Sequence, residues 1–210
     1  MSPSPGYDHL PPGQKVARGW PVLHYGPVPS FDPATWDLKV WGEVERSITL
    51  SYQELRALPA ARSRGDFHCV TKFSVLDNEW EGVAFSVIAD MCRPKPEAGF
   101  VMAHCEHGYE ANLPLELMLD DDVLLAWGRN GERLTPEHGY PLRLVVPKRY
   151  AWKSAKWVRG VEFMAKDRRG FWEERGYHNS ADPLKEERYS FQEKPGQKRP
   201  GMRSIWRRFR

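Results

Sequence analysis

The sequence contains few cysteines and lacks the long apolar runs of membrane proteins. Its three cysteines are an odd, sparse set that does not fit a secreted disulfide framework, so we expect reduced thiols. No run approaches the roughly 20 apolar residues that span a bilayer. The N-terminus shows neither a basic segment followed by an apolar one nor a twin arginine. We therefore expect a cytoplasmic protein without a membrane span.

Two further absences concern ligands. The sequence has no G-x-G-x-x-G element, which argues against a dinucleotide bound in a Rossmann crevice. It also has no recognised nucleic-acid motif. The net charge of +3 comes from a basic tail, because residues 194–210 contain seven Lys or Arg and no acid. We expect this tail to be solvated or packed on the body of the protein, and we expect no nucleic-acid partner.

Proline is concentrated at the start of the chain. Residues 1–35 contain eight prolines, which predicts an extended N-terminal arm whose order depends on docking. The total length of 210 residues suits one compact domain. We assign the arm to residues 1–35, the domain to residues 36–190 and the basic tail to residues 191–210.

The pattern along the domain mixes strands and helices. Apolar and polar residues alternate over residues 36–41, which predicts a half-buried strand. Ser51 and Glu54 form a capping box that predicts a helix over residues 52–58, and Asn130-Gly131 is typical of a tight hairpin. Further strands are expected at residues 47–50, 67–71, 100–105, 123–127, 133–134, 142–146 and 156–164, and helical segments at residues 85–91 and 115–119. Because strict βαβ alternation is missing, the sequence predicts a single α+β (mixed α/β) domain.

Two His-Cys pairs, His68-Cys69 and His104-Cys105, raise the question of a zinc site. Adjacent side chains in a strand point to opposite faces, so each pair offers one ligand at most to a shared ion, and we do not expect zinc. Cys69 remains open as the nucleophile of a cysteine hydrolase or as a core thiol. Sequence separation does not show whether a base lies within reach; the candidate bases are His104, His107 and His138.

Residues 138–157 combine an apolar strand with basic side chains. Arg143 lies inside the apolar run, where a charge needs a fixed partner. Guanidinium binds phosphate through a planar fork and lysine binds it as a point charge. Arg143, Lys153 and Lys156 therefore predict an anion cradle.

The segment Gly65-Asp66-Phe67-His68-Cys69-Val70-Thr71, with Trp80-Glu81-Gly82 after it, precedes this basic segment by about seventy residues. Together the two segments resemble the sulfite oxidase family of molybdopterin oxidoreductases, which includes bacterial catalytic subunits that reduce methionine sulfoxide. The resemblance covers roughly residues 20–189. It implies a sulfite-oxidase-type molybdopterin-binding domain, a molybdenum–molybdopterin cofactor and two-electron oxygen-atom transfer at a small sulfur- or nitrogen-containing substrate.

Residue roles follow from the resemblance. Cys69 matches the thiolate that binds molybdenum and is therefore the implied catalytic and metal-binding residue. The positions that match the pterin and phosphate contacts are His24, Tyr25, Gly26, Cys105, His138, Arg143, Ser154, Ala155 and Lys156. Because no haem domain accompanies them, the resemblance implies an external electron donor or acceptor. Further candidates for the pocket wall are Trp80, His104 and Tyr109.

One departure limits the substrate. Sulfite oxidases carry an Arg-Asn-His run before the Pro-Val-Pro that here is Pro27-Val28-Pro29, and this chain has Leu23-His24-Tyr25 in that place. Losing a guanidinium removes a charge-assisted contact to a small dianion, which argues against sulfite. Sulfite oxidase proper and a non-catalytic cofactor carrier remain the alternatives.

Overall fold

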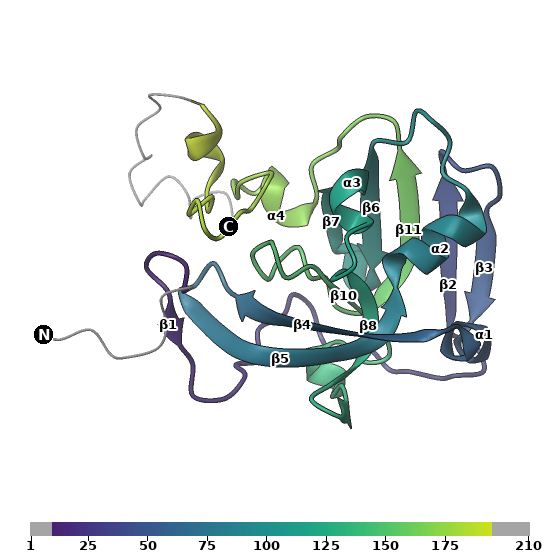
Figure 1. Ribbon diagram of the computed structural model, residues 1–210, viewed down its shortest axis with the longest axis horizontal. Helices are drawn as coiled ribbons and strands as arrows, with labels where there is room; N and C mark the ends of the chain where they lie inside the picture. Colours follow the sequence, from purple (N-terminus) through teal and green to yellow (C-terminus); the bar gives the residue numbers. More distant parts are fainter. Residues whose placement is uncertain (1–9, 195–210) are drawn as a thin grey trace, which may run out of the picture.

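The computed structural model describes residues 10–194, which form two β-sheets with short helices around them (Figure 1). One sheet contains β1 (Lys15–Val16), β4 (Ala60–His68), β5 (Phe73–Ala84), β8 (Leu124–Arg129), β9 (Glu132–Arg133) and β10 (Arg143–Val145). The other contains β2 (Asp37–Gly42), β3 (Ile48–Ser51), β6 (Phe100–Cys105), β7 (Glu110–Pro114) and β11 (Val158–Met164). The helices are α1 (Tyr52–Ala57), α2 (Phe85–Cys92), α3 (Leu115–Met118) and α4 (Phe171–Glu174).

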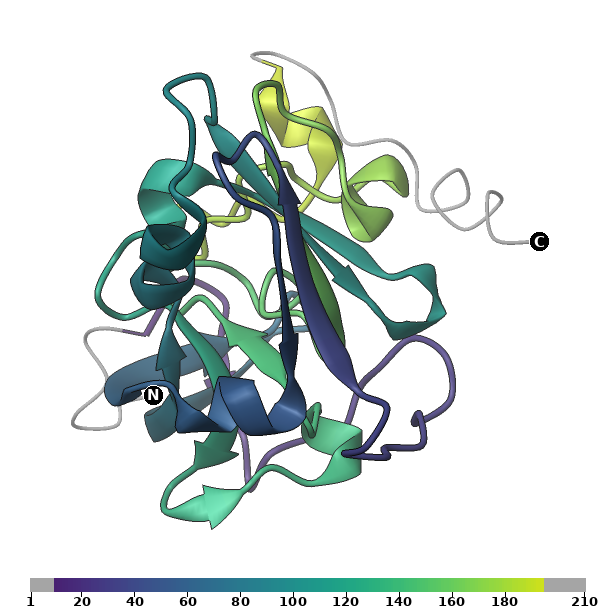
Figure 2. The same cartoon turned by 90° about the vertical axis from the view of Figure 1, so that its right-hand side faces the viewer.

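The strand order explains how distant parts of the chain meet. The first sheet runs β1-β5-β8-β10, with β4 paired to β5 and β9 to β8, and the second runs β3-β2-β11-β6-β7. Strand β11 is parallel to β2 and antiparallel to β6. Figure 2 shows the second sheet from its β2–β3 side, with α1 at its lower end and α2 beside it. This single domain of mixed sheets and a few helices confirms the predicted fold class.

The first sheet is buried on both faces at β8 and β10. Leu125 of β8 and Leu144 of β10 belong to the main core with Val40 and Phe163 of the second sheet, and α2 packs there as well. The next residues along β8 and β10 belong to a second apolar cluster on the other face. Trp20, from the N-terminal arm, packs against that second cluster. The arm therefore covers a face of the sheet that would otherwise be exposed.

Several predicted elements are confirmed. Ser51 and Glu54 form the capping box of α1, and residues 37–42 alternate between buried and more exposed positions. Asn130 and Gly131 both adopt positive φ, at 52° and 79°, in the turn between β8 and β9. Strand β11 begins at Val158 rather than at residue 156, because Trp157 has a φ of 58° that interrupts the extended backbone.

Strands β5 and β7 were not predicted, and β4 is longer than expected. The pairing of β4 with β5 is irregular between Gly65 and Phe67, and that of β5 with β8 between Glu81 and Gly82. Such bulges break the two-residue alternation by which a strand is recognised in a sequence. Gly82 is required at its bulge, because a Cβ there would lie 2.2 Å from the Leu125 carbonyl oxygen.

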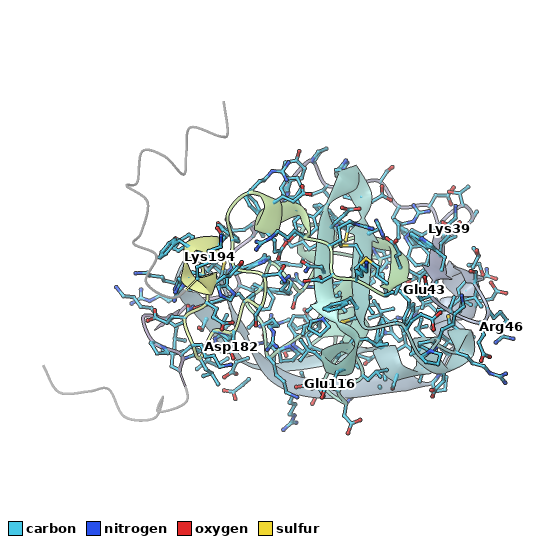
Figure 3. The ribbon with its side chains drawn as sticks, turned by 90° about the horizontal axis from the view of Figure 1, so that it is seen from above. Lys39, Glu43, Arg46, Glu116, Asp182 and Lys194 are labelled. Atoms are coloured by element: carbon cyan, nitrogen blue, oxygen red, sulfur yellow. The ribbon has the colours of Figure 1, made fainter. Side chains whose placement is uncertain are left out.

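The C-terminal part of the described chain lies far from β2 and β3. Figure 3 places Asp182 and Lys194 at one end of the molecule and Lys39, Glu43 and Arg46 at the other. The predicted basic tail over residues 191–210 falls mostly outside the described residues. Among residues 10–194, no helix is long and apolar enough to cross a membrane.

Candidate active site

Cys69 lies in the turn between β4 and β5. Its N–H donates to the Phe73 carbonyl oxygen at 2.8 Å, and the Lys72 N–H donates back to the Cys69 carbonyl oxygen at 3.0 Å. Lys72 has a φ of 76°, which reverses the chain. The Thr71 hydroxyl donates to Cys69 Sγ over 3.2 Å. The predicted strand over residues 67–71 is therefore wrong beyond His68, and the turn presents Cys69 to a cavity.

This cavity has a volume of about 320 Å³, which is within the range of small-molecule sites. Its walls come from the N-terminal arm, the Cys69 turn, the segment from residue 151 to residue 157, and the region around α4. Among the residues predicted from the sequence, those that line it are His24, Tyr25, Cys69, His138, Arg143, Ser154, Ala155 and Lys156.

Gly26 and Cys105, although predicted from the sequence, do not line the cavity. Gly26 has a φ of 73°, and a Cβ there would lie 2.9 Å from the His107 ring. Its carbonyl oxygen accepts a hydrogen bond from His24 Nδ1 at 2.8 Å. Cys105 is buried in β6, where burial raises the pKa of its thiol. Gly26 shapes the arm, and Cys105 lies in the core behind the cavity.

His138, Arg143 and Lys156 form one side of the cavity, which we call the cationic half. Arg143 is 2% exposed, and its Nη1 and Nη2 donate to the carbonyl oxygens of His138 at 2.9 Å and Ser154 at 3.1 Å. Its buried Nε has no hydrogen-bond partner. Burial lowers the pKa of Arg143 to about 9. Within residues 10–194 no carboxylate forms an ion pair with Arg143; two carbonyl oxygens and the faces of the Phe67 and Trp20 rings are its partners.

The other two members of the cationic half are held by backbone and aromatic contacts. Lys156 Nζ donates to the carbonyl oxygens of Leu23 at 2.8 Å and Glu137 at 2.6 Å. Burial, and after it the charge of Arg143, lowers the pKa of Lys156 to about 7. His138 stacks on Trp20 with ring centroids 3.9 Å apart, and burial lowers its pKa. An anion bound here would favour the charged form of each group.

A second group of lining residues, which we call the aromatic half, consists of Tyr109, Trp152, Trp172 and Tyr177. The Tyr177 ring lies 4.9 Å from Trp152 and 5.1 Å from Trp172, measured between centroids. The Tyr109 hydroxyl donates to the Trp152 carbonyl oxygen at 2.5 Å. Burial raises the pKa of Tyr177 to about 12, so its hydroxyl is neutral at ordinary pH. In the described chain, no Lys or Arg side chain lines this half.

Lys153 does not belong to the anion cradle, contrary to the prediction. Its Nζ lies 2.6 Å from Glu173 Oε1, and both side chains are buried. The same Nζ donates to Asn112, at 2.7 Å to the carbonyl and 2.9 Å to the side-chain oxygen. Trp152 Nε1 also donates to Glu173 Oε1, at 2.7 Å. The charge of Lys153 is therefore neutralised behind the aromatic half.

Two other wall candidates lie elsewhere. The His104 ring sits between Glu110 and Glu162, with each ring nitrogen 2.9 Å from a carboxylate oxygen, and it does not line the cavity. Trp80 is buried in the second apolar cluster. Tyr109, the third wall candidate, does line the cavity.

Among the described residues, no candidate base forms a hydrogen bond with Cys69, as a cysteine hydrolase would require. Both ring nitrogens of His138 are engaged, one with the Thr135 hydroxyl at 3.0 Å and the other with the Trp20 carbonyl oxygen at 3.3 Å. No histidine in the described chain forms a hydrogen bond with Cys69 Sγ. Nor do three or more His, Cys, Asp or Glu residues there gather closely enough to hold a metal ion. A metal bound through one protein thiolate would not depend on such a cluster.

Sequence reasoning missed most of the aromatic wall. Trp20, Trp152, Trp157 and Trp172 all line the cavity. The available signal was the number of tryptophans, nine in the whole chain, and their concentration after residue 150. That signal does not distinguish a cavity wall from ordinary core packing.

Comparison with known proteins identifies the family. Residues 25–172 match the family model of the oxidoreductase molybdopterin binding domain. The uncharacterized oxidoreductase YuiH of Bacillus subtilis (strain 168) is 47% identical over 183 residues, which cover 87% of this chain and 92% of the relative. The catalytic subunit MsrP of the protein-methionine-sulfoxide reductase of Campylobacter jejuni is 27% identical over 73% of this chain and 59% of its own length.

A solved structure shows the same fold. The sulfane dehydrogenase SoxCD from Paracoccus pantotrophus matches with a TM-score of 0.63 and 26% identity. The match covers 68% of this chain and 41% of that chain. This chain thus spans less than two thirds of the SoxCD chain and of MsrP.

Proposed function

Because the chain belongs to the oxidoreductase molybdopterin-binding domain family, we propose that it performs two-electron oxygen-atom transfer at a small sulfur- or nitrogen-containing substrate. The family makes it an enzyme that uses the molybdenum cofactor and needs both a substrate and an electron partner. The observation that carries the proposal is the position of Cys69. Its side chain lines the same cavity as Arg143 and Lys156 of the cationic half and Tyr177 of the aromatic half.

The cavity residues fit the cofactor chemically. Cys69 supplies a soft thiolate, which suits molybdenum, and coordination would keep the sulfur deprotonated. Arg143 offers a buried cation that lacks a carboxylate partner, with an Nε–H that forms no hydrogen bond, and Lys156 adds a second cation to the same half. These groups suit the pterin phosphate. When bound, the cofactor supplies the two-electron redox chemistry.

The protein's own residues then have distinct proposed roles. The cationic half holds the phosphate end of the cofactor, and Ser154 and Ala155 close over it from the same wall. His24 and Tyr25 contribute from the N-terminal arm. Cys69 binds the metal at the junction of the two halves. The aromatic half excludes water and receives the substrate.

The aromatic half also bears on the choice of substrate. A small anion such as sulfite requires a desolvated positive charge near the reacting atom. Lys153 is a buried cation behind this half, but Glu173 neutralises it. Leu23 lines the cavity where sulfite oxidases carry an arginine-containing run. Both observations favour an uncharged sulfoxide or N-oxide over sulfite.

Metal and turnover measurements test the proposal. The protein is produced in a host that makes the molybdenum cofactor, and its molybdenum and pterin contents are measured. Reduced-dye assays then compare sulfoxides and N-oxides, with sulfite-dependent reduction of an acceptor as the opposing assay. We expect near-stoichiometric metal and turnover of an uncharged oxide. Folded protein without molybdenum would overturn the proposal, sulfite turnover alone would indicate sulfite oxidase proper, and bound cofactor without any turnover would indicate a carrier.

A further inference from the structure

Side chains from both ends of the described chain reach the backbone of the Cys69 turn. Gln14 Nε2 donates to the Cys69 carbonyl oxygen at 3.0 Å. Arg188 Nη1 donates to the Val70 carbonyl oxygen at 2.7 Å. Gln14 is 7% exposed and Arg188 is 6% exposed; the hydrogen bond from Gln14 is buried and that from Arg188 is partly buried. The two partners are 174 positions apart in the sequence, yet they hold adjacent peptide units.

We propose that Gln14 and Arg188, here called the terminal clamp, are positioning residues that fix the turn carrying Cys69. This inference rests on the proposed role of Cys69 as the metal ligand. It adds that the place of the sulfur depends on the two terminal segments and not only on the β4–β5 hairpin.

The N-terminal side of the clamp is part of a buried network. Strand β1 pairs in parallel with the start of β5, which brings Gln14 beside the turn. Gln14 Oε1 accepts from the Ser74 hydroxyl at 3.4 Å, and that hydroxyl lies 2.7 Å from His68 Nδ1. Gln14 therefore connects Cys69 with both strands that flank the turn. A buried amide group without such partners would be costly, so the network favours one orientation of the side chain.

The C-terminal side of the clamp joins the two terminal segments to each other. Arg188 Nη2 donates to the Pro12 carbonyl oxygen at 3.3 Å, and the guanidinium lies 4.8 Å from the centre of the Tyr150 ring. Gly13 allows a close approach, because a Cβ there would lie 3.2 Å from Glu186 Oε1. Figure 1 shows both terminal segments at the same end of the molecule.

The turn itself offers little other restraint on the sulfur. Thr71 supplies the hydrogen bond to Cys69 Sγ, but Thr71 belongs to the same turn and moves with it. The hydrogen bonds that the Cys69 N–H and the Lys72 N–H donate are also internal to the hairpin. Contacts from outside the hairpin are therefore needed to fix the turn against the cavity. Besides the clamp, the Ala151 N–H donates to the His68 carbonyl oxygen at 2.7 Å, and the Lys15 N–H of β1 donates to the Lys72 carbonyl oxygen at 3.0 Å.

The first test uses protein without cofactor, made in a host that cannot synthesise it. Gln14→Met keeps the side-chain length and removes the donor to Cys69. We expect alkylation at Cys69, followed by mass spectrometry of its peptide, to become about fivefold faster, the factor equivalent to a hydrogen bond of about 1 kcal/mol. Hydrogen exchange at Lys72 should rise with it.

Ser63→Ala is the matched control. It removes a hydrogen bond of the same β4–β5 hairpin, from the Ser63 hydroxyl to the Asp122 carbonyl oxygen at 3.1 Å, at a site roughly 20 Å along the strand from Cys69. We expect its alkylation rate to match the wild type. Arg188→Met removes the other half of the clamp. Arg188→Lys retains the charge but loses the planar fork, and is available if Arg188→Met does not fold. We expect its Cys69 alkylation rate to lie between those of the wild type and Gln14→Met.

The second test uses the loaded enzyme. In Gln14→Met we expect unchanged molybdenum content, a shifted electron paramagnetic resonance signal of the one-electron-reduced metal, and a lower kcat at unchanged KM. Ser63→Ala should change none of these. Wild-type alkylation and exchange rates in Gln14→Met would overturn the clamp, whatever its activity. Absence of molybdenum from the wild type would instead overturn the proposed function, while faster alkylation of the cofactor-free variant would still support the clamp.

Discussion

The two halves of the cavity differ in whether their buried cation has a carboxylate partner. In the cationic half, Arg143 is buried without a carboxylate partner in the described chain, and Lys156 lies beside it. Behind the aromatic half, Lys153 is equally buried but lies 2.6 Å from Glu173 Oε1. The cationic half can therefore still bind an anionic ligand, whereas the cation behind the aromatic half is already paired with a carboxylate of the protein.

Under the proposed function, this difference would let a single cavity separate cofactor from substrate. Uncompensated buried cations destabilise the empty protein and favour an anionic ligand. A neutralised cation contributes structure without attracting anions. Cys69 lines the cavity together with both groups, so under the proposed function the metal would lie near both a cationic phosphate site and a neutral aromatic wall.

The largest effect is expected from Cys69, at the junction of the halves. Cys69→Ser replaces a soft sulfur ligand with a weakly acidic hydroxyl, and should abolish turnover while the fold remains intact. Steady-state assays and circular dichroism measure the two properties. Cys92→Ala, a buried thiol of α2 outside the cavity, should retain activity. Full turnover of Cys69→Ser with a full complement of molybdenum would contradict the assigned role.

The next effect concerns the neutralised half. Glu173→Gln leaves the buried Lys153 ammonium without its counter-charge, which should cost about 3–5 kcal/mol of the free energy of unfolding. Urea denaturation of cofactor-free protein measures it. Asp120→Asn breaks the exposed pair with Lys148, whose atoms are 2.8 Å apart, and should cost at most about 1 kcal/mol. Equal losses in the two variants would show that Lys153 does not depend on Glu173.

A smaller effect is expected in the cationic half. Arg143→Met removes a charge-assisted contact to the phosphate, worth about 1.5–3 kcal/mol, so cofactor should bind roughly tenfold to 150-fold more weakly. Molybdenum content after dialysis measures this loss. In cofactor-free protein the same change should destabilise less than Glu173→Gln, because removing Arg143 leaves no buried carboxylate without its counter-charge. The exposed Arg62→Met serves as the control, and unchanged metal content in Arg143→Met would contradict the prediction.

The site residues that could be predicted from the sequence are those that belong to a recognisable local motif. Cys69 and Arg143 belong to such segments, and both line the cavity. Lys153 was misjudged because its partner Glu173 lies 20 positions away, and sequence distance does not show which cation is neutralised. Gln14 was not considered at all, because its role arises only from the pairing of β1 with β5.

The same limit applies to the fold. Regular alternation revealed β2, and the capping box revealed the start of α1. Strand β5 was not predicted, because the irregular pairing at Gly82 interrupts its alternation of buried and exposed residues. Features that depend on the residues of a single element could be predicted from the sequence. The aromatic half could not, because its residues come from segments that are far apart in the chain.

The smallest expected effect is a pH dependence confined to the cationic half. The pKa of Lys156 is lowered to about 7, chiefly by burial. The unfolded chain, with an ordinary lysine pKa, therefore binds more protons between about pH 7 and pH 10.5. In that window this group makes the cofactor-free protein more stable as pH rises. Anion binding should weaken as pH rises, because it requires the protonated form of Lys156.

Sulfate is a suitable probe, since its charge does not change between pH 6.5 and pH 8. Over this interval His138, whose pKa is lowered, stays mainly neutral, and Arg143, with a pKa of about 9, stays mainly charged. The protonated fraction of a group with a pKa of about 7 falls about eightfold over the interval, so sulfate affinity should fall by up to that factor. Titration calorimetry of cofactor-free protein measures it, and Lys156→Gln should bind weakly with a nearly flat profile. An equal pH dependence in wild type and Lys156→Gln would assign the titrating group elsewhere and remove Lys156 from the anion site.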